Sequence, residues 1–316
     1  MTEIHALAVE VAAAVTRAVQ PLLGRPAARR PVGWAPGGDA TLGIDEVAET
    51  EVERVLAAAG DIAMYSEDRG YVVHGRPRAI LVIDPVDGTR PAAAGLEAAC
   101  VSVAVVPPRQ DATLGEVEFG VVQELRSGAR FTATRGGGAR AEDPTGGAIP
   151  IRPSPTTDLA SMFWAGGVRG RPSVPVAIVL ERLVDDGAMH GGYFDLGSAA
   201  FDLTRIVTGQ LDAYIDVGRR IVDEVPATEP AFMRVGRGNL CTNFPYDVAA
   251  AALIVEEAGG VVTHADGRPL DGHPAVGSGR NEGLAVIGAA SPALHRAILE
   301  EVDRGMIRLA GTDLRD

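Results

Sequence analysis

Two aspartates and a threonine end an apolar run in residues 80–89, whose sequence is ILVIDPVDGT. Asp84 and Asp87 are three residues apart, at the end of what we expect to be a buried strand. Carboxylates this close repel each other and have raised pKa values unless a cation lies between them or water separates them. A hard divalent metal ion, which prefers oxygen ligands, is the simplest explanation. The alternative is a plain turn, since Asp-Gly pairs are common turn formers.

The residues after these acids could bind an anion. Gly88 allows a tight turn that directs the following backbone N–H groups into the site, and Pro91 suits the first turn of a short helix. Metal and phosphate could therefore be bound on adjacent faces of one turn.

Acidic residues at two other places strengthen the metal hypothesis. Glu67 and Asp68 follow a short apolar strand that ends at Ser66, and Asp247 begins an otherwise apolar helix. Asp247 alone could simply cap that helix or complement its dipole. Together, the three segments are typical of ligands that converge on one cleft.

The spacing of apolar residues predicts the elements that must position these acids. In the first half we expect two helices on a largely antiparallel sheet, with helices at 4–22 and 45–59 and strands at 62–66, 79–83, 101–106, 115–123 and 131–134. In the second half strands and helices alternate, with strands at 162–165, 213–217, 260–263 and 284–288 and helices at 174–183, 198–208, 247–258 and from a Ser291 cap onward.

This pattern predicts an α+β/α/β protein built as a layered α-β-α-β-α sandwich. We expect residues 1–150 to form an N-terminal α+β lobe with the metal and phosphate motifs. Residues 151–316 would form a C-terminal α/β lobe with the substrate-side residues and Asp247. Strands from both lobes would meet at the cleft.

Composition excludes several functional classes. All 29 basic residues are arginine, which excludes enzymes that need a Schiff-base, P-loop or kinase lysine. The net charge of −13 argues against a nucleic-acid surface. No apolar run reaches the roughly 20 residues that span a bilayer, and the N-terminus lacks a basic signal-peptide region. We therefore expect a cytoplasmic protein that binds neither nucleic acid nor membrane.

The acidic motifs together resemble those of a known family. They are Ser66-Glu67-Asp68, Asp84-Pro85-Val86-Asp87-Gly88-Thr89, and Tyr246-Asp247-Val248-Ala249-Ala250 followed by Glu257-Ala258-Gly259-Gly260. Their order and spacing resemble the inositol monophosphatase family, in the lithium-sensitive, magnesium-dependent phosphatase superfamily that also holds fructose-1,6-bisphosphatases. The acidic segment 37–46 and the stretch 197–216 extend the resemblance to roughly residues 5–300.

The resemblance implies a role for each matching residue. The ligands of two or three Mg²⁺ ions, with Mn²⁺ as a substitute, would be Glu67, Asp84, the carbonyl of Val86, Asp87 and Asp247. The resemblance implies that the catalytic residues are Thr89, Asp45 and Glu67. Asp45 would hold a metal-bound water molecule, and Thr89 would orient the attacking water molecule. The N–H groups of Gly88 and Thr89 would bind the phosphate. The alcohol portion of the substrate would face Gly197, Ser198, Ala199 and Asp216.

We therefore expect a Mg²⁺-dependent phosphomonoesterase that acts on a small sugar or cyclitol phosphate, such as an inositol phosphate or a fructose bisphosphate, through metal-activated water. A nucleotide-type phosphatase acting on a phosphoadenosine-like compound is one alternative. A catalytically degenerate subunit that binds metal or a phosphorylated metabolite is another. The resemblance also implies a homodimer.

Some residues depart from the family pattern. After the pair Thr89-Arg90 the family usually has Asn, often followed by an aromatic residue, whereas this chain has Pro91 and Ala92, so one backbone N–H and one side-chain donor are missing. The stretch between Asp216 and Asp247 is longer than in simple inositol phosphatases and rich in arginine. It is either a surface excursion or a lid that sets specificity. Asp223 within it is a rival to Asp247 as the late metal ligand.

Overall fold

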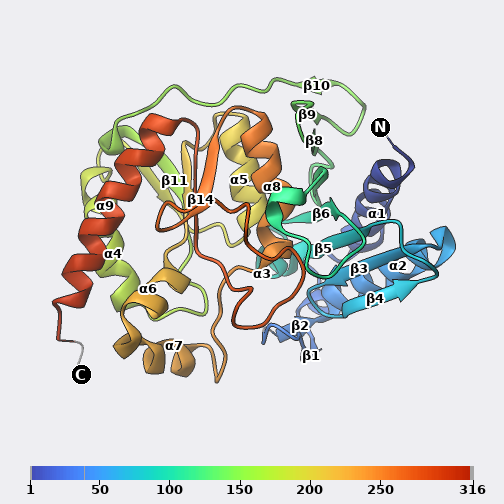
Figure 1. The fold of residues 1–316 in the computed structure, drawn as a ribbon, viewed down its shortest axis with the longest axis horizontal. Helices are drawn as coiled ribbons and strands as arrows, with labels where there is room; N and C mark the ends of the chain where they lie inside the picture. Colours follow the sequence, from blue (N-terminus) through green and yellow to red (C-terminus); the bar gives the residue numbers. More distant parts are fainter. Residues whose placement is uncertain (1, 39, 314–316) are drawn as a thin grey trace.

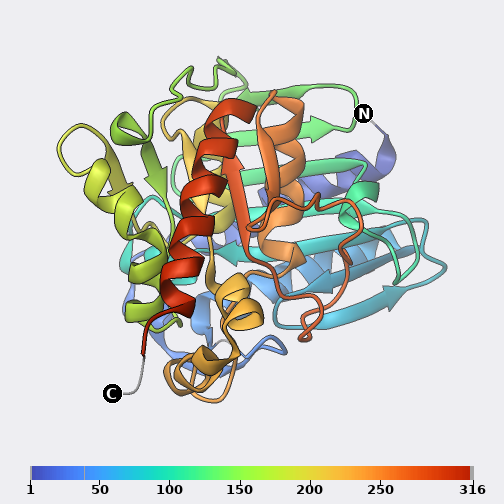
Figure 2. The same ribbon diagram turned by 60° about the vertical axis from the view of Figure 1, so that its left-hand side comes forward.

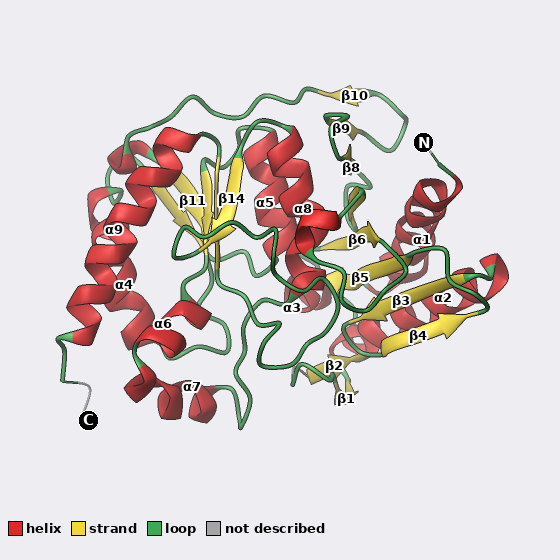
Figure 3. Ribbon diagram, in the orientation of Figure 1, coloured by secondary structure: helices red, strands yellow, loops and turns green. Residues whose placement is uncertain are grey.

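Five alternating layers of helix and sheet make up the computed structural model, which describes residues 2–38 and 40–313. Figure 1 shows the layers side by side, from α4 and α9 at one edge to α1 and α2 at the other, and Figure 3 separates their helices from their strands. The predicted α-β-α-β-α sandwich is confirmed. Asp39, in the acidic segment ahead of the second helix, lies outside the described residues.

The first outer layer and the first sheet come from the N-terminal half. Helices α1 (Glu3–Val19) and α2 (Gly43–Ala59) cover one face of an eight-stranded sheet. Its spatial order is β10 (Ala148–Ile149), β9 (Ala139–Glu142), β8 (Arg130–Thr134), β7 (Phe119–Glu124), β6 (Cys100–Val106), β5 (Ile80–Asp87), β3 (Ile62–Ser66) and β4 (Gly70–His74). The β3–β5 pair is parallel and the other pairs are antiparallel, so the sheet is largely antiparallel, as predicted.

Strand β5 shows why its sequence is a continuous apolar run. Ile80 and Val82 belong to the core on the α5 and α8 side of the sheet, whereas Leu81 and Ile83 belong to the core under α1 and α2. A strand covered on both faces has no side that tolerates polar residues. The acids at its end therefore lie in the interior of the protein.

The second half supplies the other three layers. Helices α5 (Ala199–Val207) and α8 (Pro245–Glu257) lie between the two sheets. The second sheet has the order β12 (Gly192–Phe194), β11 (Phe163–Ala165), β13 (Ala213–Ile215), β15 (Val286–Ala289) and β14 (Val261–His264). Helices α4 (Ser173–Asp186) and α9 (Pro292–Ala310) form the last layer, and Figure 2 shows α9 crossing in front of this sheet. Short elements complete the fold: β1 (Pro31–Trp34), β2 (Ala40–Leu42), α3 (Thr89–Ala94), α6 (Gly218–Glu224) and α7 (Glu229–Val235).

One predicted strand is wrong in its first part. Residues 115–123 were expected to be extended throughout, but Leu114–Glu116 forms a 3-10 turn and β7 begins only at Phe119. The turn is stabilised because the Glu116 carboxylate accepts a hydrogen bond from the backbone N–H of Thr113. The sequence analysis did not predict the short strands β1, β2, β4, β9, β10 and β12.

The chain passes from the first sheet to the second between Ile149 and Leu159, where the predicted lobe boundary falls. The core between the sheets contains residues from both halves, because α5 and α8 pack on strands of the first sheet. Among the described residues, no helix is both long and apolar enough to cross a bilayer.

Candidate active site

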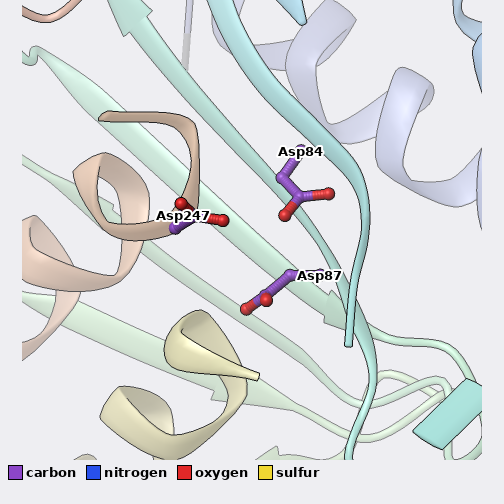
Figure 4. A group of neighbouring side chains, drawn as sticks. All are labelled: Asp84, Asp87 and Asp247. Carbon is purple, nitrogen blue, oxygen red and sulfur yellow. The ribbon is translucent and has the colours of Figure 1, made fainter. Parts of the chain in front are cut away.

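Three aspartates from two distant segments converge at one point; Asp84 and Asp87 are buried, and Asp247 is partly buried. Asp84 and Asp87 come from the end of β5, and Asp247 comes from the first turn of α8. One carboxylate oxygen from each lies within 4.8 Å of the others. Figure 4 shows the three carboxylates directed toward a common space between β5 and α8. The structure thus brings together three of the predicted metal ligands.

Local hydrogen bonds hold each of these carboxylates in place. The backbone N–H of Val86 donates to Asp84 Oδ1 at 2.9 Å, and the backbone N–H of Phe244 donates to Asp247 Oδ2 at 2.6 Å. Asp247 is therefore a helix cap, as the simpler interpretation held, and it faces the acidic cluster as well. The pairing of β5 with β6 is irregular between Asp84 and Asp87, which lets both side chains reach the same side.

Asp87 also connects β5 to α5. Its Oδ2 accepts hydrogen bonds from Ser198 Oγ at 2.7 Å and from the backbone N–H of Ala200 at 2.6 Å. Ser198 is at the same time the N-cap of α5. These hydrogen bonds therefore fix the N-terminus of α5 against the end of β5.

Burial raises the pKa values of all three acids, and repulsion by neighbouring carboxylates adds to the rise for Asp84 and Asp247. Burial raises the pKa of Asp87 to about 6 and, together with the charge of Asp87, that of Asp247 to about 8. The pKa of Asp84 lies well above its ordinary value because of burial and the charges of Glu67 and the other two aspartates. Oxygen ligands of this kind, costly to ionise without a counter-charge, fit a hard divalent cation.

Glu67 follows the end of β3 and lines the same cleft. The residues on either side of it are held by Glu49, a buried residue that the sequence analysis did not identify. Glu49 of α2 is fully buried and accepts hydrogen bonds from Ser66 Oγ at 2.9 Å and from the backbone N–H of Asp68 at 3.0 Å. The clue in the sequence was its position four residues after Asp45, on the core-facing side of the helix.

The turn after Asp87 is built as expected. Gly88 has φ +87°, and a Cβ atom there would come within 2.5 Å of the carbonyl oxygen of Ala98, so only glycine fits. Thr89 Oγ1 donates to the carbonyl of Val86 at 3.1 Å. Val86, Gly88 and Thr89 all line the cleft, and Pro91 lies in the first turn of α3 as predicted.

The predicted substrate-side residues divide into two groups. Gly197, Ser198 and Ala199 line the cleft. Asp216 is not among the lining residues: it accepts hydrogen bonds from Arg171 Nη2 at 2.6 Å and Asn243 Nδ2 at 2.7 Å. Its effect on the cleft therefore passes through the arginine and asparagine, which do line it.

Asp45 is also absent from the lining residues. Its carboxylate caps α2 by accepting a hydrogen bond from the backbone N–H of Leu42 at 2.7 Å. Two other cleft residues were missed by sequence reasoning. Arg169 lines the cleft, and its positive charge lowers the pKa values of both Asp87 and Asp247. Asp202 lines it from α5.

The arginine-rich stretch between Asp216 and Asp247 lies mostly away from the cleft. Helices α6 and α7 sit beside the lower ends of α4 and α9 (Figure 1), and Arg219 and Arg220 line a separate cavity. Both are paired within their own helix, with Asp223 and Glu224 respectively. Asp223 is exposed and lies outside the three-aspartate cluster. Within this stretch, all of which the structure describes, the residues that line the cleft are in its last part, Cys241 to Phe244 and Tyr246.

Comparisons with known proteins agree with this geometry. The chain is 30% identical over 306 residues to the "Fructose-1,6-bisphosphatase/inositol-1-monophosphatase" of Methanothermobacter thermautotrophicus, covering 94% of this chain and 95% of that one. It is 25% identical to the "Bifunctional NADP phosphatase/NAD kinase" of Methanocaldococcus jannaschii, over 84% of this chain and 45% of that protein.

A solved structure has the same fold. The extragenic suppressor protein suhB of Bartonella henselae superposes with a TM-score of 0.70 at 21% identity, covering 96% of this chain and all of that one. The sequence model of the inositol monophosphatase family matches residues 1–305. The buried acidic cluster and this match lead to the same conclusion: the chain belongs to the inositol monophosphatase family.

Proposed function

We propose that the protein is a Mg²⁺-dependent phosphomonoesterase acting on a small sugar or cyclitol phosphate. The observation that carries the proposal is the convergence of Asp84, Asp87 and Asp247 at a cleft that also receives the turn at Gly88 and Thr89. Family membership supports a phosphatase. The Methanothermobacter relative is named as a phosphatase of both a fructose bisphosphate and an inositol phosphate.

In this proposal the three aspartates, Glu67 and the carbonyl of Val86 would hold two or three Mg²⁺ ions, for which Mn²⁺ could substitute. Bound magnesium supplies charge neutralisation for the phosphate and a water of lowered pKa. The hydrogen bonds from Ser198 and Ala200 keep Asp87 from turning away from the cluster. Such preorganisation avoids a cost of rearrangement during the reaction.

Other residues of the chain bind and orient the reacting groups. The N–H groups of Gly88 and Thr89 would bind the phosphate oxygens. Thr89 Oγ1 uses its proton on the carbonyl of Val86, so its lone pairs remain to accept a proton of the attacking water. Asp45, which does not line the cleft, would act only through a water. The guanidinium of Arg169 would offset the donors that are lost at Pro91.

A second candidate is a nucleotide-type phosphatase, favoured by the NADP phosphatase name of the Methanocaldococcus relative. Its substrate would need room for a base, and Tyr246 and Phe244 on the cleft wall, with ring centres 5.6 Å apart, offer aromatic faces for it. We further propose that the protein is a cytoplasmic homodimer.

Phosphate release tests the function. The purified protein would be assayed with myo-inositol 1-phosphate, fructose 1,6-bisphosphate, glycerol 2-phosphate, 3′-phosphoadenosine 5′-phosphate and NADP, each with Mg²⁺ or with EDTA. We expect turnover only with the metal, and fastest for a sugar or cyclitol ester. Preference for the two nucleotides would favour the second candidate, and magnesium binding without any turnover would indicate a degenerate binding subunit.

A further inference from the structure

Asp202 is a buried acid that lines the candidate cleft, and no residue that the structure describes forms a hydrogen bond or an ion pair with its carboxylate. It lies on α5 one turn after Ser198, and only 2% of its surface is exposed. Its Oδ1 is completely enclosed. None of the roles assigned above uses this side chain.

Neighbouring buried aspartates differ in this respect. Asp87 accepts two hydrogen bonds, Asp216 is paired with Arg171, and Asp212 accepts one from the backbone N–H of Phe163 at 2.7 Å. Burying a carboxyl group without a hydrogen-bond partner costs free energy, and such unpartnered groups are rare in native proteins. A group that lines a cleft can find its partner in the ligand.

The environment also defines what kind of partner fits. Burial, and then the charge of Asp87, raise the pKa of Asp202 well above its ordinary value. A neutral carboxyl group has one O–H donor and a carbonyl acceptor. An alcohol hydroxyl likewise donates and accepts, so the two form a complementary pair. The nearest cation on its own helix, Arg205, is paired with Glu124 and stacks on Phe131.

The position of Asp202 relative to the metal cluster is fixed. Ser198 Oγ and the backbone N–H of Ala200 both bond to Asp87, and these residues precede Asp202 on the same helix. A ligand whose phosphate lies at the acidic cluster would therefore present its alcohol portion at a set distance toward this side chain. Tyr214 and Asn243, joined by a 3.0 Å hydrogen bond, line the same part of the cleft.

We propose that Asp202 is a specificity-determining residue that hydrogen-bonds a hydroxyl group on the alcohol portion of the substrate, an inference that rests on the proposed phosphatase function. It would select phosphate esters of polyols over esters whose leaving group has no hydroxyl.

Two variants test this proposal against two classes of ester. Asp202→Ala removes both donor and acceptor, whereas Asp202→Asn keeps one of each in the same shape. The measured quantity is the ratio of kcat/KM for myo-inositol 1-phosphate or glycerol 2-phosphate to that for 4-nitrophenyl phosphate. A hydrogen bond of ordinary strength predicts that Asp202→Ala lowers this ratio about tenfold, mainly through KM. Asp202→Asn should restore most of it.

Asp212→Ala is the matched control, because Asp212 is a buried acid with a protein partner and lies outside the cleft. It should lower the melting temperature and leave the ratio unchanged, whereas Asp202→Ala should lower the melting temperature less. An unchanged ratio in Asp202→Ala, or equal losses on both classes of ester, would overturn the proposal. If the wild-type protein hydrolyses 4-nitrophenyl phosphate with Mg²⁺, the phosphatase function stands in either case. Failure of the wild type on every ester would overturn both.

Discussion

Replacing Asp87 by asparagine should stabilise the metal-free protein while removing its response to magnesium. In the absence of metal, Asp87 is a fully buried acid whose folded-state pKa is raised from 3.8 to about 6. A raised carboxyl pKa means that the folded state loses stability as the pH rises through that value. Asparagine keeps the shape and one acceptor oxygen for Ser198 and Ala200 but does not ionise.

The size of the effect follows from the shift. Two pKa units correspond to about 3 kcal/mol at pH 8, and weaker hydrogen bonds to an amide than to a carboxylate subtract about 1 kcal/mol. The net gain of about 2 kcal/mol corresponds to a melting temperature about 3 °C higher, because a chain of 316 residues unfolds with an entropy of roughly 0.7 kcal/mol per kelvin. Below pH 4, where the aspartate is protonated in both states, the gain should vanish.

Thermal melts of wild type and Asp87→Asn in EDTA at pH 4 and pH 8, and in Mg²⁺ at pH 8, measure this directly. Binding of Mg²⁺ should raise the melting temperature of the wild type, since it binds only the folded state, and should raise that of the variant much less. Asp223→Asn, at an exposed acid, is the control and should behave as wild type. A variant that melts below wild type in EDTA at pH 8, or that responds equally to Mg²⁺, would refute the reasoning.

Three further predictions concern activity. Asp247→Asn should abolish phosphate release while Asp223→Asn retains it, as initial rates at saturating Mg²⁺ will show; the reverse would make Asp223 the late ligand. Arg169→Gln should raise KM and weaken product inhibition by inorganic phosphate about tenfold, because a charge-assisted hydrogen bond is lost; equal inhibition constants would place the guanidinium away from the phosphate. Arg219→Gln should leave the ranking of substrates unchanged and Asn243→Ala should alter it, judged by kcat/KM across the ester panel; the opposite pattern would restore the arginine-rich stretch as a specificity lid.

Long, periodic elements were predictable because their apolar spacing reflects which faces are covered. The layered order, the antiparallel first sheet and the Ser291-capped last helix all followed from this spacing. Short edge strands such as β4 and β12 were not predictable, because their few residues carry too weak an alternation. The 3-10 turn at Leu114–Glu116 is stabilised by one hydrogen bond to the Glu116 carboxylate. The apolar pattern of residues 115–123 is that of a strand and does not reveal this bond.

The acids at the end of β5 predicted a candidate metal site, because two carboxylates at the end of an interior strand need a compensating charge, and the structure places them beside Asp247 in a cluster that could hold a metal ion. The tight turn at Gly88 was also predictable from the residue type, whereas the positive φ and the nearby carbonyl of Ala98, which together exclude a side chain, were seen only in the structure. The predictable features depend on residues that are neighbours along the chain.

Tertiary structure alone decided the partners of residues far apart in sequence. It placed Asp247 beside Asp84, paired Asp216 with Arg171 and placed Arg219 at another cavity. Among the described residues, it left the Asp202 carboxylate without a hydrogen-bond partner. Each outcome depends on how two layers pack and on which of the neighbouring side chains forms the hydrogen bond. Spacing along the chain specifies the face of an element, whereas the charge and bonding of a buried group are set by what the opposite layer brings to it.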